Sequence, residues 1–482
     1  MANLAREQFL ASKPDIFVII TDQERHHTHW PSGLRNKVMP SWSKLESQGL
    51  RFKRAYCSSA QCSPSRACML TGEYSNINGV PTLPDDGMPT IASLPNIATV
   101  LGEAGYDVFW KGKWHLSFPV GFKGGPPSNE VWTEADIPAL KQKYAMQQWN
   151  TPDAGNAAGA YTPSEASDPT ARAADLATAG GGNANNDGRY VSGYQSGSKE
   201  TPGFGISALA QLGELAKTPQ GQRKPFAMFV SLVNPHDITF FPDAWQDAGY
   251  SVSDATSTVV PLPPNMSDSL TKKPSVQKAY RDALNSKSPF EGAGNTPQNY
   301  VNFYAHLHSV VEPQIEKLLL FLSSSNMMKS TIIVRTSDHG ELGMSHGLRE
   351  KSYTAYEEMI HVPFVISNPV LFPTAQKTDA FYSHVDLLPT LASIAQAKPV
   401  GVGKSMLPVI LDPSKAVQNG VLFAFDDNFL LASDTPGSHI RAIREGDWTY
   451  AVYYGATGGP FEYELYNNKT DPGQMNNLAG SK

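Results

Sequence analysis

Short apolar runs that end abruptly in polar residues are the feature that most restricts how this chain can fold. Residues 15–21 (DIFVIIT) and 331–336 (TIIVRT) are rich in β-branched residues, and an aspartate, Asp22 or Asp338, follows each run closely. Continuous apolar runs of this length are typical of parallel strands that are buried on both faces. The pattern therefore predicts an α/β fold built around a parallel sheet.

Two further apolar runs also end in residues that can carry charge. Lys113 and His115 follow residues 106–110, and His236 follows residues 226–233. In open α/β sheets, ligands bind beyond the carboxyl ends of parallel strands. We therefore expect these three side chains and the two aspartates to meet at one edge of the sheet, although the sequence scatters them over more than 300 positions.

The segment 62–73, CSPSRACMLTGE, predicts a helix whose first turn belongs to the same edge. Ser63 suits an N-cap, Pro64 suits the first helical position, and Gly72 suits the C-cap. Cys62 then lies at a helix N-terminus, which favours anions, and Arg66 follows one turn later. Taken alone, Cys62 can equally be an ordinary free cysteine beside a helix cap.

This segment resembles the signature of the formylglycine-dependent sulfatases of the alkaline phosphatase superfamily, C-x-P-S-R followed by Leu-Thr-Gly. The matching residues are Cys62, Pro64, Ser65, Arg66, Leu70, Thr71 and Gly72, whereas Glu73 stands where the family often has arginine. In that family a separate enzyme oxidises the cysteine to formylglycine, which is the nucleophile once hydrated. The segments GKWH (112–115), NPHD (234–237) and SDHGE (337–341) extend the resemblance.

The resemblance implies an alkaline-phosphatase-like α/β fold in two domains. Residues 1–397 would form a large catalytic domain with a mixed, mostly parallel sheet between helices, and residues 398–482 a small domain with an antiparallel sheet. Residues 151–202 are rich in Gly, Ala and Asn and lack periodicity, so we expect a long insertion or a mobile flap there.

A metal site is also implied by the resemblance. Its expected ligands are Asp22, Gln23, Asp338 and His339, together with the group made from Cys62. The family has a pair of acids after the first strand, so Gln23 is a departure that is similar to the phosphonate monoester hydrolases. We expect one divalent cation, with Ca²⁺ first, because carboxylates are hard ligands; the imidazole of His339 would also suit Mn²⁺.

The resemblance gives the remaining residues catalytic roles. Arg66, Lys113 and Lys351 would bind the sulfate, His236 or Lys351 would protonate the departing alcohol, and His115 would take a proton from the second hydroxyl of hydrated formylglycine. The prediction is therefore an arylsulfatase-like hydrolase of sulfate monoesters.

Two other functions remain open at this point. A phosphonate monoester or phosphodiester hydrolase of the same superfamily is favoured by Gln23 and His339 and opposed by Lys113 and His115, and weak promiscuous activity on both substrate classes fits the resemblance. A binding scaffold in which Cys62 stays unmodified is the other alternative.

Composition restricts partners and location. A net charge of -6 argues against nucleic acid as a partner, and no apolar run reaches the roughly 20 residues of a membrane span. Without a recognisable signal peptide, and with only Cys57, Cys62 and Cys68, the chain is expected in the cytoplasm. The expected partners are a small-molecule sulfate ester and a formylglycine-generating enzyme, and an oligomer is left open.

Three histidines, His26, His27 and His29, follow the first acidic strand end. Histidines this close together can bind metal, but their polar neighbours favour a surface loop, and we expect them to lie in one.

Overall fold

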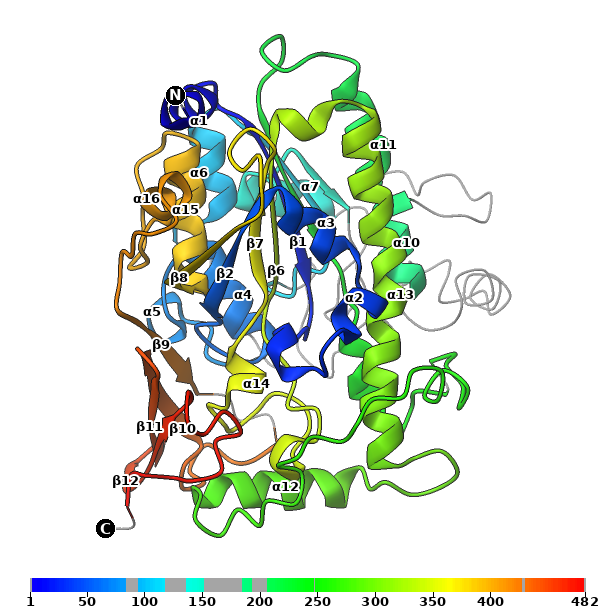
Figure 1. Ribbon diagram of the computed structural model, residues 1–482, viewed down its shortest axis with the longest axis vertical. Coiled ribbons are helices and arrows are strands. Elements are labelled where there is room, and N and C mark those ends of the chain that lie inside the picture. The colour runs from blue at the N-terminus through cyan, green and yellow to red at the C-terminus, as the bar shows by residue number, and fades with distance from the viewer. Residues whose placement is uncertain are drawn as a thin grey trace.

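An eight-stranded sheet lies at the centre of the computed structural model, which describes residues 2–83, 94–117, 136–150, 184–192, 206–246, 248–426 and 430–480 (Figure 1). The strands follow the spatial order β4-β3-β5-β1-β6-β7-β2-β8. Their bounds are β1 Asp15–Thr21, β2 Gly49–Tyr56, β3 Asp107–Gly112, β4 Gln148–Asn150, β5 Phe226–Ser231, β6 Thr331–Ser337, β7 Phe364–Ser367 and β8 Gln376–Ser383.

The sheet is mixed and mostly parallel, which confirms the predicted fold class. β1 pairs in parallel with β5 and with β6, and every residue of these three strands is buried. β7 runs antiparallel to its neighbours β6 and β2. The polar run QKTDAFYS of β8, which pairs in parallel with β2, was not expected as a strand.

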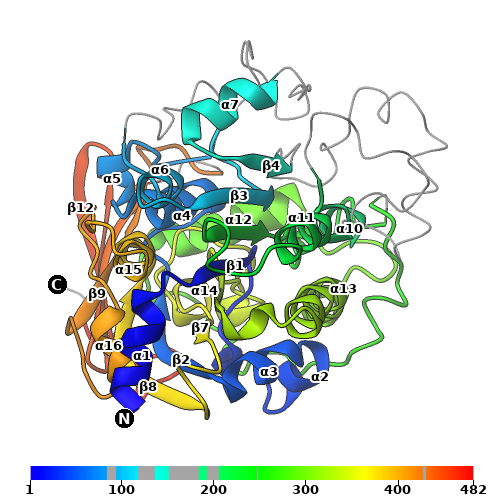
Figure 2. The same cartoon turned by 90° about the horizontal axis from the view of Figure 1, so that it is seen from above.

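Helices cover both faces of the sheet (Figure 2). Side chains of alternate residues on β1 point to opposite faces, so Ile16, Val18 and Ile20 pack with one group of helices and Phe17 and Ile19 with the other. The first group is α1 (Ala2–Ala11), α4 (Cys62–Thr71), α6 (Ile97–Glu103), α15 (Leu387–Ile394) and α16 (Leu407–Leu411). The second is α2 (Leu34–Val38), α3 (Ser41–Ser47), α10 (Ala184–Ser192), α11 (Ala208–Ala216) and α13 (Pro297–Ser324).

The remaining described α-helices are α5 (Ser75–Asn78), α7 (Asp136–Tyr144), α12 (Ser275–Lys287) and α14 (Glu357–Ile360). Among the described helices, none is both long and apolar enough to cross a bilayer.

A second, four-stranded antiparallel sheet lies at the lower left of Figure 1, as predicted for the C-terminal region. It consists of β9 (Gly420–Phe425), β10 (His439–Glu445), β11 (Trp448–Gly455) and β12 (Gly458–Asn467). Its inward side chains, including Phe423 and Ile440, join the same hydrophobic core as Leu387 of α15. The boundary at residue 398 therefore stays a prediction.

Most of the segment 151–202 lies outside the described residues, so its expected role as an insertion or flap stays a prediction. Residues 184–192 within it form α10, which packs against α13 and α11. Asp187 of this helix is buried, and its carboxylate accepts hydrogen bonds from the backbone N–H groups of Val233 and Asn234. Part of the segment therefore supports the loop that follows β5.

Candidate active site

Asp22 and Asp338 lie side by side because β1 and β6 are parallel and in register. Thr21 pairs with Ser337, so the residue after each strand occupies the same level, and the Asp338 N–H donates to the Thr21 carbonyl at 3.1 Å. Both aspartates are fully buried. Their carboxylates therefore concentrate negative charge at the carboxyl edge of the sheet.

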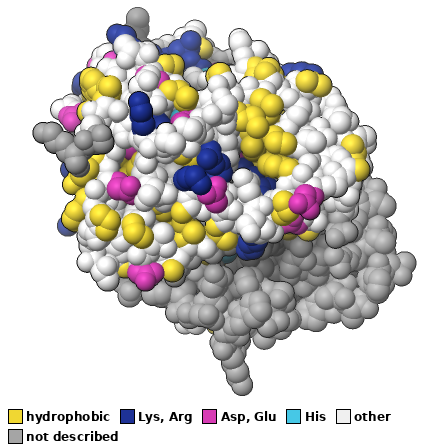
Figure 3. Space-filling view, turned by 90° about the horizontal axis from the view of Figure 1, so that it is seen from below, with side chains coloured by type: hydrophobic (Ala, Val, Ile, Leu, Met, Phe, Trp, Pro, Cys, Tyr) yellow, Lys and Arg dark blue, Asp and Glu magenta, His cyan; other side chains and the backbone are white. Residues whose placement is uncertain are grey.

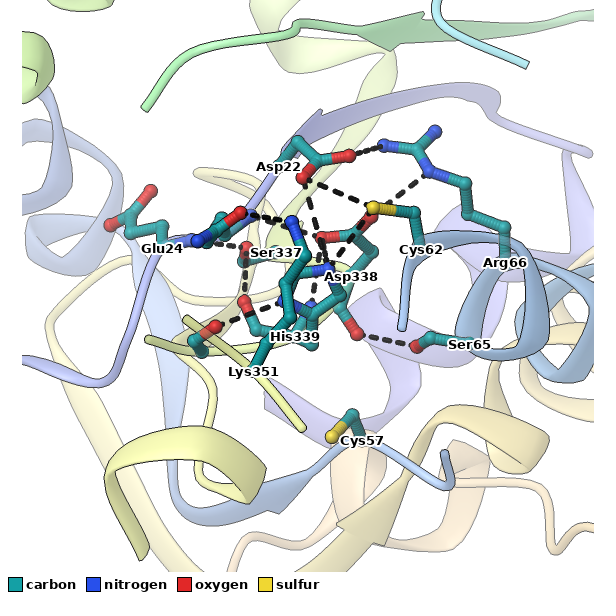
Figure 4. Close-up of polar contacts among 12 residues, drawn as sticks. Asp22, Glu24, Cys57, Cys62, Ser65, Arg66, Ser337, Asp338, His339 and Lys351 are labelled. Atoms are coloured by element: carbon teal, nitrogen blue, oxygen red, sulfur yellow. Dashed lines mark hydrogen bonds and ion pairs between the residues drawn. The ribbon is translucent and has the colours of Figure 1, made fainter. Parts of the chain in front are cut away.

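Cys62 faces this pair from the first residue of α4. Its Sγ lies 3.7 Å from Asp22 Oδ1 and 3.4 Å from His339 Nε2, and Figure 4 shows it directed at both side chains. The helix begins at Cys62, and its N-cap residue is Gln61, so the expected N-cap at Ser63 is wrong. Ser63 Oγ instead donates to the His115 carbonyl at 2.6 Å, which ties the start of α4 to the segment after β3. Gly72 is the C-cap as predicted.

Arg66 joins both aspartates through separate nitrogens. Its Nη2 donates to Asp22 Oδ2 and its Nε to Asp338 Oδ2, each at 2.9 Å (Figure 4). Its Nη1 donates to Ser231 Oγ at 2.8 Å and to the Lys113 carbonyl at 2.9 Å. The guanidinium is therefore held rigidly, and its positive charge lies beside Cys62.

His339 presents one ring nitrogen to the carboxylates. Its Nδ1 lies 2.9 Å from the Gly340 carbonyl, which accepts a hydrogen bond, so Nδ1 carries a proton and Nε2 faces the cluster. Nε2 lies 3.8 Å from Asp22 Oδ1 and 3.7 Å from Asp338 Oδ1. A backbone carbonyl that orients an imidazole in this way is the usual support of a metal-binding histidine.

The donor set fits a divalent cation. One ligand atom from each of Asp22, Cys62, Asp338 and His339 lies within 4.8 Å of the others. Burial lowers the pKa of His339, but Asp338 and then Cys62 overcome this effect and raise it to about 9. The cluster thus stabilises positive charge at this point, either as a proton on His339 or as a bound cation.

The two aspartates titrate differently. Burial would raise the pKa of Asp22, but Lys113, His236 and Arg66 lower it well below its usual value. Burial and the neighbouring Asp22 carboxylate raise the pKa of Asp338. Two adjacent carboxylates cannot both ionise easily, so Asp338 is the one whose ionisation a cation would favour most.

Lys113 and His115 reach the site from the end of β3. Lys113 Nζ lies 2.7 Å from Asp22 Oδ2 and 3.8 Å from Cys62 Sγ, and its side chain is fully buried. His115 is half-buried, and its φ of 57° is unusual for a residue other than glycine. Burial, then Lys113 and Arg66, lower the pKa of His115, so its imidazole is neutral at pH 7.

His236 comes from the short helix after β5. It is 5% exposed, and among the described residues its Nδ1 has no hydrogen-bond partner. Burial, then Lys113 and Lys351, lower its pKa. An unpartnered polar atom in a buried site is suited to a group that a substrate brings.

Lys351 and Gln23 lie against each other. Lys351 Nζ donates a hydrogen bond to Gln23 Oε1, while Gln23 Nε2 donates to Glu341 Oε2 at 2.5 Å. The Gln23 backbone N–H donates to Asp338 Oδ1 at 3.1 Å. The side-chain oxygen that was expected to bind the cation therefore contacts Lys351 here, and its role as a ligand stays a prediction.

Sequence reasoning missed three supporting residues. Ser231 holds Arg66, Glu341 holds Gln23, and Asp187 holds the loop before His236. Ser231 and Glu341 stand within segments that drew attention, at the end of an apolar run and in SDHGE. Asp187 lies in the segment of low complexity, where nothing in the sequence distinguishes it.

The other two cysteines are buried, as expected, and take no part in the site. Burial raises the pKa of Cys57 and raises that of Cys68 to about 12, so both are thiols. Figure 4 shows Cys57 well away from the charged group. On the face seen from below in Figure 3, a few Lys and Arg side chains lie near the middle, with an acidic side chain beside them.

Comparison with known proteins gives two matching family models. The model described as Sulfatase matches residues 14–397, and the model described as N-sulphoglucosamine sulphohydrolase, C-terminal, matches residues 344–482. An N-acetylglucosamine-6-O-sulfatase of Bacteroides thetaiotaomicron is 24% identical, over 99% of this chain and 84% of the relative. A choline-sulfatase of Rhizobium meliloti is 24% identical, over 97% of this chain and 82% of the relative.

Two solved structures are similar in fold. One is a protein in complex with its substrate D-glucosamine-2-N,6-O-disulfate, with a TM-score of 0.64 and 20% identity over 97% of this chain and 94% of the other. The second is a phosphonate monoester hydrolase from Silicibacter pomeroyi, with a TM-score of 0.63 and 20% identity over 97% of this chain and 91% of the other.

Proposed function

This chain belongs to the sulfatase family, and on that premise we propose that its sulfate ester hydrolysis takes place around residue 62, with formylglycine made from Cys62 as the nucleophile. The chain is a sulfuric ester hydrolase of the alkaline phosphatase superfamily. The observation that carries the assignment of the site is the position of Cys62 Sγ, which lies within 4 Å of Asp22, His339 and Lys113. The phosphonate hydrolase alternative is not favoured, because the matching family model and the two relatives found by sequence are sulfatases, whereas the phosphonate monoester hydrolase is similar in fold alone.

The surroundings of residue 62 suit a nucleophile that attacks an anion. Three buried cations, Arg66, Lys113 and Lys351, can stabilise the sulfate oxygens as negative charge builds up on them. A divalent cation held by Asp22, Asp338 and His339 would lower the pKa of a nearby hydroxyl and neutralise sulfate charge. The carboxylates suit Ca²⁺, whereas the His339 nitrogen suits Mn²⁺.

The two histidines have complementary proton roles in the proposal. His115 is neutral at pH 7, as a base must be, and in this proposal it takes a proton from a hydroxyl of residue 62. His236 is also neutral before substrate binds, but the negative charge of a bound sulfate ester favours its protonated form. It can then donate that proton to the departing alcohol oxygen.

The alcohol half of the substrate and the partners stay proposals. The relatives act on alcohols as different as an amino sugar and choline, so we propose a small sulfate monoester without naming the alcohol. A formylglycine-generating enzyme is the proposed maturation partner, with the cytoplasm as the proposed location.

Intact-mass analysis of the peptide that contains residue 62 tests the nucleophile. Conversion of the thiol to the aldehyde lowers the mass by about 18 Da, and we expect the activity of different preparations to rise with the converted fraction. Cys62→Ala should lack both the mass change and the activity. An active preparation in which residue 62 is wholly unmodified would overturn the proposal. A panel of aryl sulfates, alkyl sulfates, sulfated sugars and phosphonate monoesters then identifies the alcohol.

A further inference from the structure

A second group of metal-binding side chains lies outside the candidate active site. It joins the short helix His27–His29, which follows the end of β1, to Glu357 and His361 at the two ends of α14 (Figure 1). The His26 N–H donates to the His361 carbonyl at 3.0 Å, and the two imidazole rings stack at 3.8 Å. The expected surface loop is therefore packed against α14, with His26 buried and His29 half-buried.

The hydrogen bonds of His361 fix which of its nitrogens is free to bind. His361 Nε2 lies 3.0 Å from the Lys53 carbonyl, which can only accept, so Nε2 carries the proton. Nδ1 then presents a lone pair to His29 Nε2 at 3.3 Å and to Glu357 Oε2 at 3.5 Å. A carboxylate oxygen and an imidazole lone pair at this distance repel each other unless a proton or a cation lies between them.

The hydrogen bonds of Glu357 likewise fix which of its two carboxylate oxygens faces the histidines. Its Oε1 accepts from Arg444 Nε at 2.8 Å and from Asn468 Nδ2 at 3.2 Å. This leaves Oε2 directed at the histidines, and within the described part of the chain the Tyr56 hydroxyl is its one further donor, at 3.3 Å. Arg444 and Asn468 thus fix the orientation of the carboxylate without blocking the oxygen that faces His361.

We propose that His29, Glu357 and His361 bind a Zn²⁺ ion through Nε2, Oε2 and Nδ1. The three ligand atoms lie within 4.8 Å of one another. Bonds of about 2.0–2.1 Å in a tetrahedral site place ligand atoms about 3.3 Å apart, close to the 3.3 and 3.5 Å found between neighbouring ligand atoms here. Two nitrogens and one carboxylate are a borderline ligand set, which favours Zn²⁺ over Ca²⁺, and the half-buried His29 leaves solvent access for a fourth ligand.

The ion would join two segments that supply the active site. His29 follows Gln23 by six positions, and Glu357 follows Lys351 by six positions. Gln23 and Lys351 are themselves hydrogen-bonded. The proposed ion therefore has a structural role, and its existence does not depend on the reaction proposed for residue 62.

The test uses the entire chain and measures its zinc content and the visible absorption of its Co²⁺-loaded form. Protein stripped with a chelator and loaded with Zn²⁺ should hold one equivalent more in the wild type than in His29→Ala. The Co²⁺-loaded wild type should show the strong visible absorption of tetrahedral cobalt, which His29→Ala lacks. His29 is chosen because its half-buried position tolerates truncation better than that of His361.

His27→Ala is the matched control. His27 belongs to the same short helix, but its ring lies 3.1 Å from Arg51 Nη1 and 3.5 Å from Arg35 Nη1, a position unsuited to a cation. We expect this variant to keep the wild-type zinc content and cobalt spectrum. Equal zinc content in the wild type and His29→Ala would overturn the proposal, leaving a plain hydrogen bond between His29 and His361. A loss of zinc from His27→Ala equal to the loss from His29→Ala would also overturn the proposal.

Discussion

Lys351 Nζ donates a hydrogen bond to the side-chain oxygen of Gln23, across more than 300 positions of sequence. The amide nitrogen of Gln23 points the other way and donates to Glu341 at 2.5 Å. An amide suits this position because it offers an acceptor to the lysine and a donor to the acid at once. Its hydrogen bonds to Lys351 and Glu341 therefore account for a glutamine at position 23, where the chain departs from the family pattern.

Gln23→Glu should destabilise the protein more at pH 7 than at pH 5. The new carboxylate would face Glu341, whose pKa is already raised by burial and by Glu350. A raised pKa in the folded state gives stability that is present at low pH and is lost as the pH rises through that pKa. We expect a loss of about 1–3 kcal/mol at pH 7, measured by urea unfolding. An identical loss at both pH values would contradict this explanation.

Arg66→Ala should be among the most destabilising single changes in the site. The arginine is 2% exposed and bonds both buried aspartates, so its removal leaves two carboxylates without their shared partner. Breaking a buried ion pair in this way costs about 3–5 kcal/mol, and activity should fall at least about 10²-fold. Arg66→Lys should recover part of the stability but little of the activity, because one ammonium cannot replace the two separate hydrogen bonds.

The control for Arg66 is an exposed ion pair measured by the same unfolding experiment. Arg54 Nη2 lies 3.2 Å from Asp447 Oδ1, with side chains that are 29% and 40% exposed. Arg54→Ala should cost at most about 1 kcal/mol, because water screens an exposed pair. Similar losses for Arg54→Ala and Arg66→Ala would contradict the role given to Arg66.

The positions of the strand ends could be predicted from sequence because each apolar run and the polar residues after it are local features. Parallel pairing then brings Asp22 and Asp338 together without any knowledge of the register. The supporting contacts could not be predicted in this way. Ser63 bonds the carbonyl of His115, and Asp187 bonds the backbone after β5, and only the tertiary fold creates such pairs. The bounds of α12 could not be predicted either, because its 13 residues, SVQKAYRDALNSK, are mostly polar.

Cation binding at Asp22, Asp338 and His339 should strengthen as the pH rises from 6 to 9. His339, whose pKa is about 9, must lose a proton before Nε2 can bind a metal, so protons compete with the cation. Titration of the stripped protein at several pH values measures this competition. His339→Asn removes this titrating group and should weaken the dependence of cation affinity on pH. A smaller dependence, from the titration of Asp338, should remain. Affinity that does not change with pH in the wild type would exclude His339 as a ligand.

His236→Ala should slow esters of poor leaving groups far more than p-nitrophenyl sulfate. A poor leaving group needs a proton from His236, whereas p-nitrophenolate departs without one, and general acid catalysis contributes about 10²- to 10⁴-fold. The ratio of kcat/KM for an alkyl and an aryl sulfate is the measurement, because a merely structural loss lowers both values together. His236 Nδ1 has no hydrogen-bond partner among the described residues, so truncation breaks no bond at that nitrogen and the fold should persist. Equal losses on the two esters would contradict the role of His236 as the general acid.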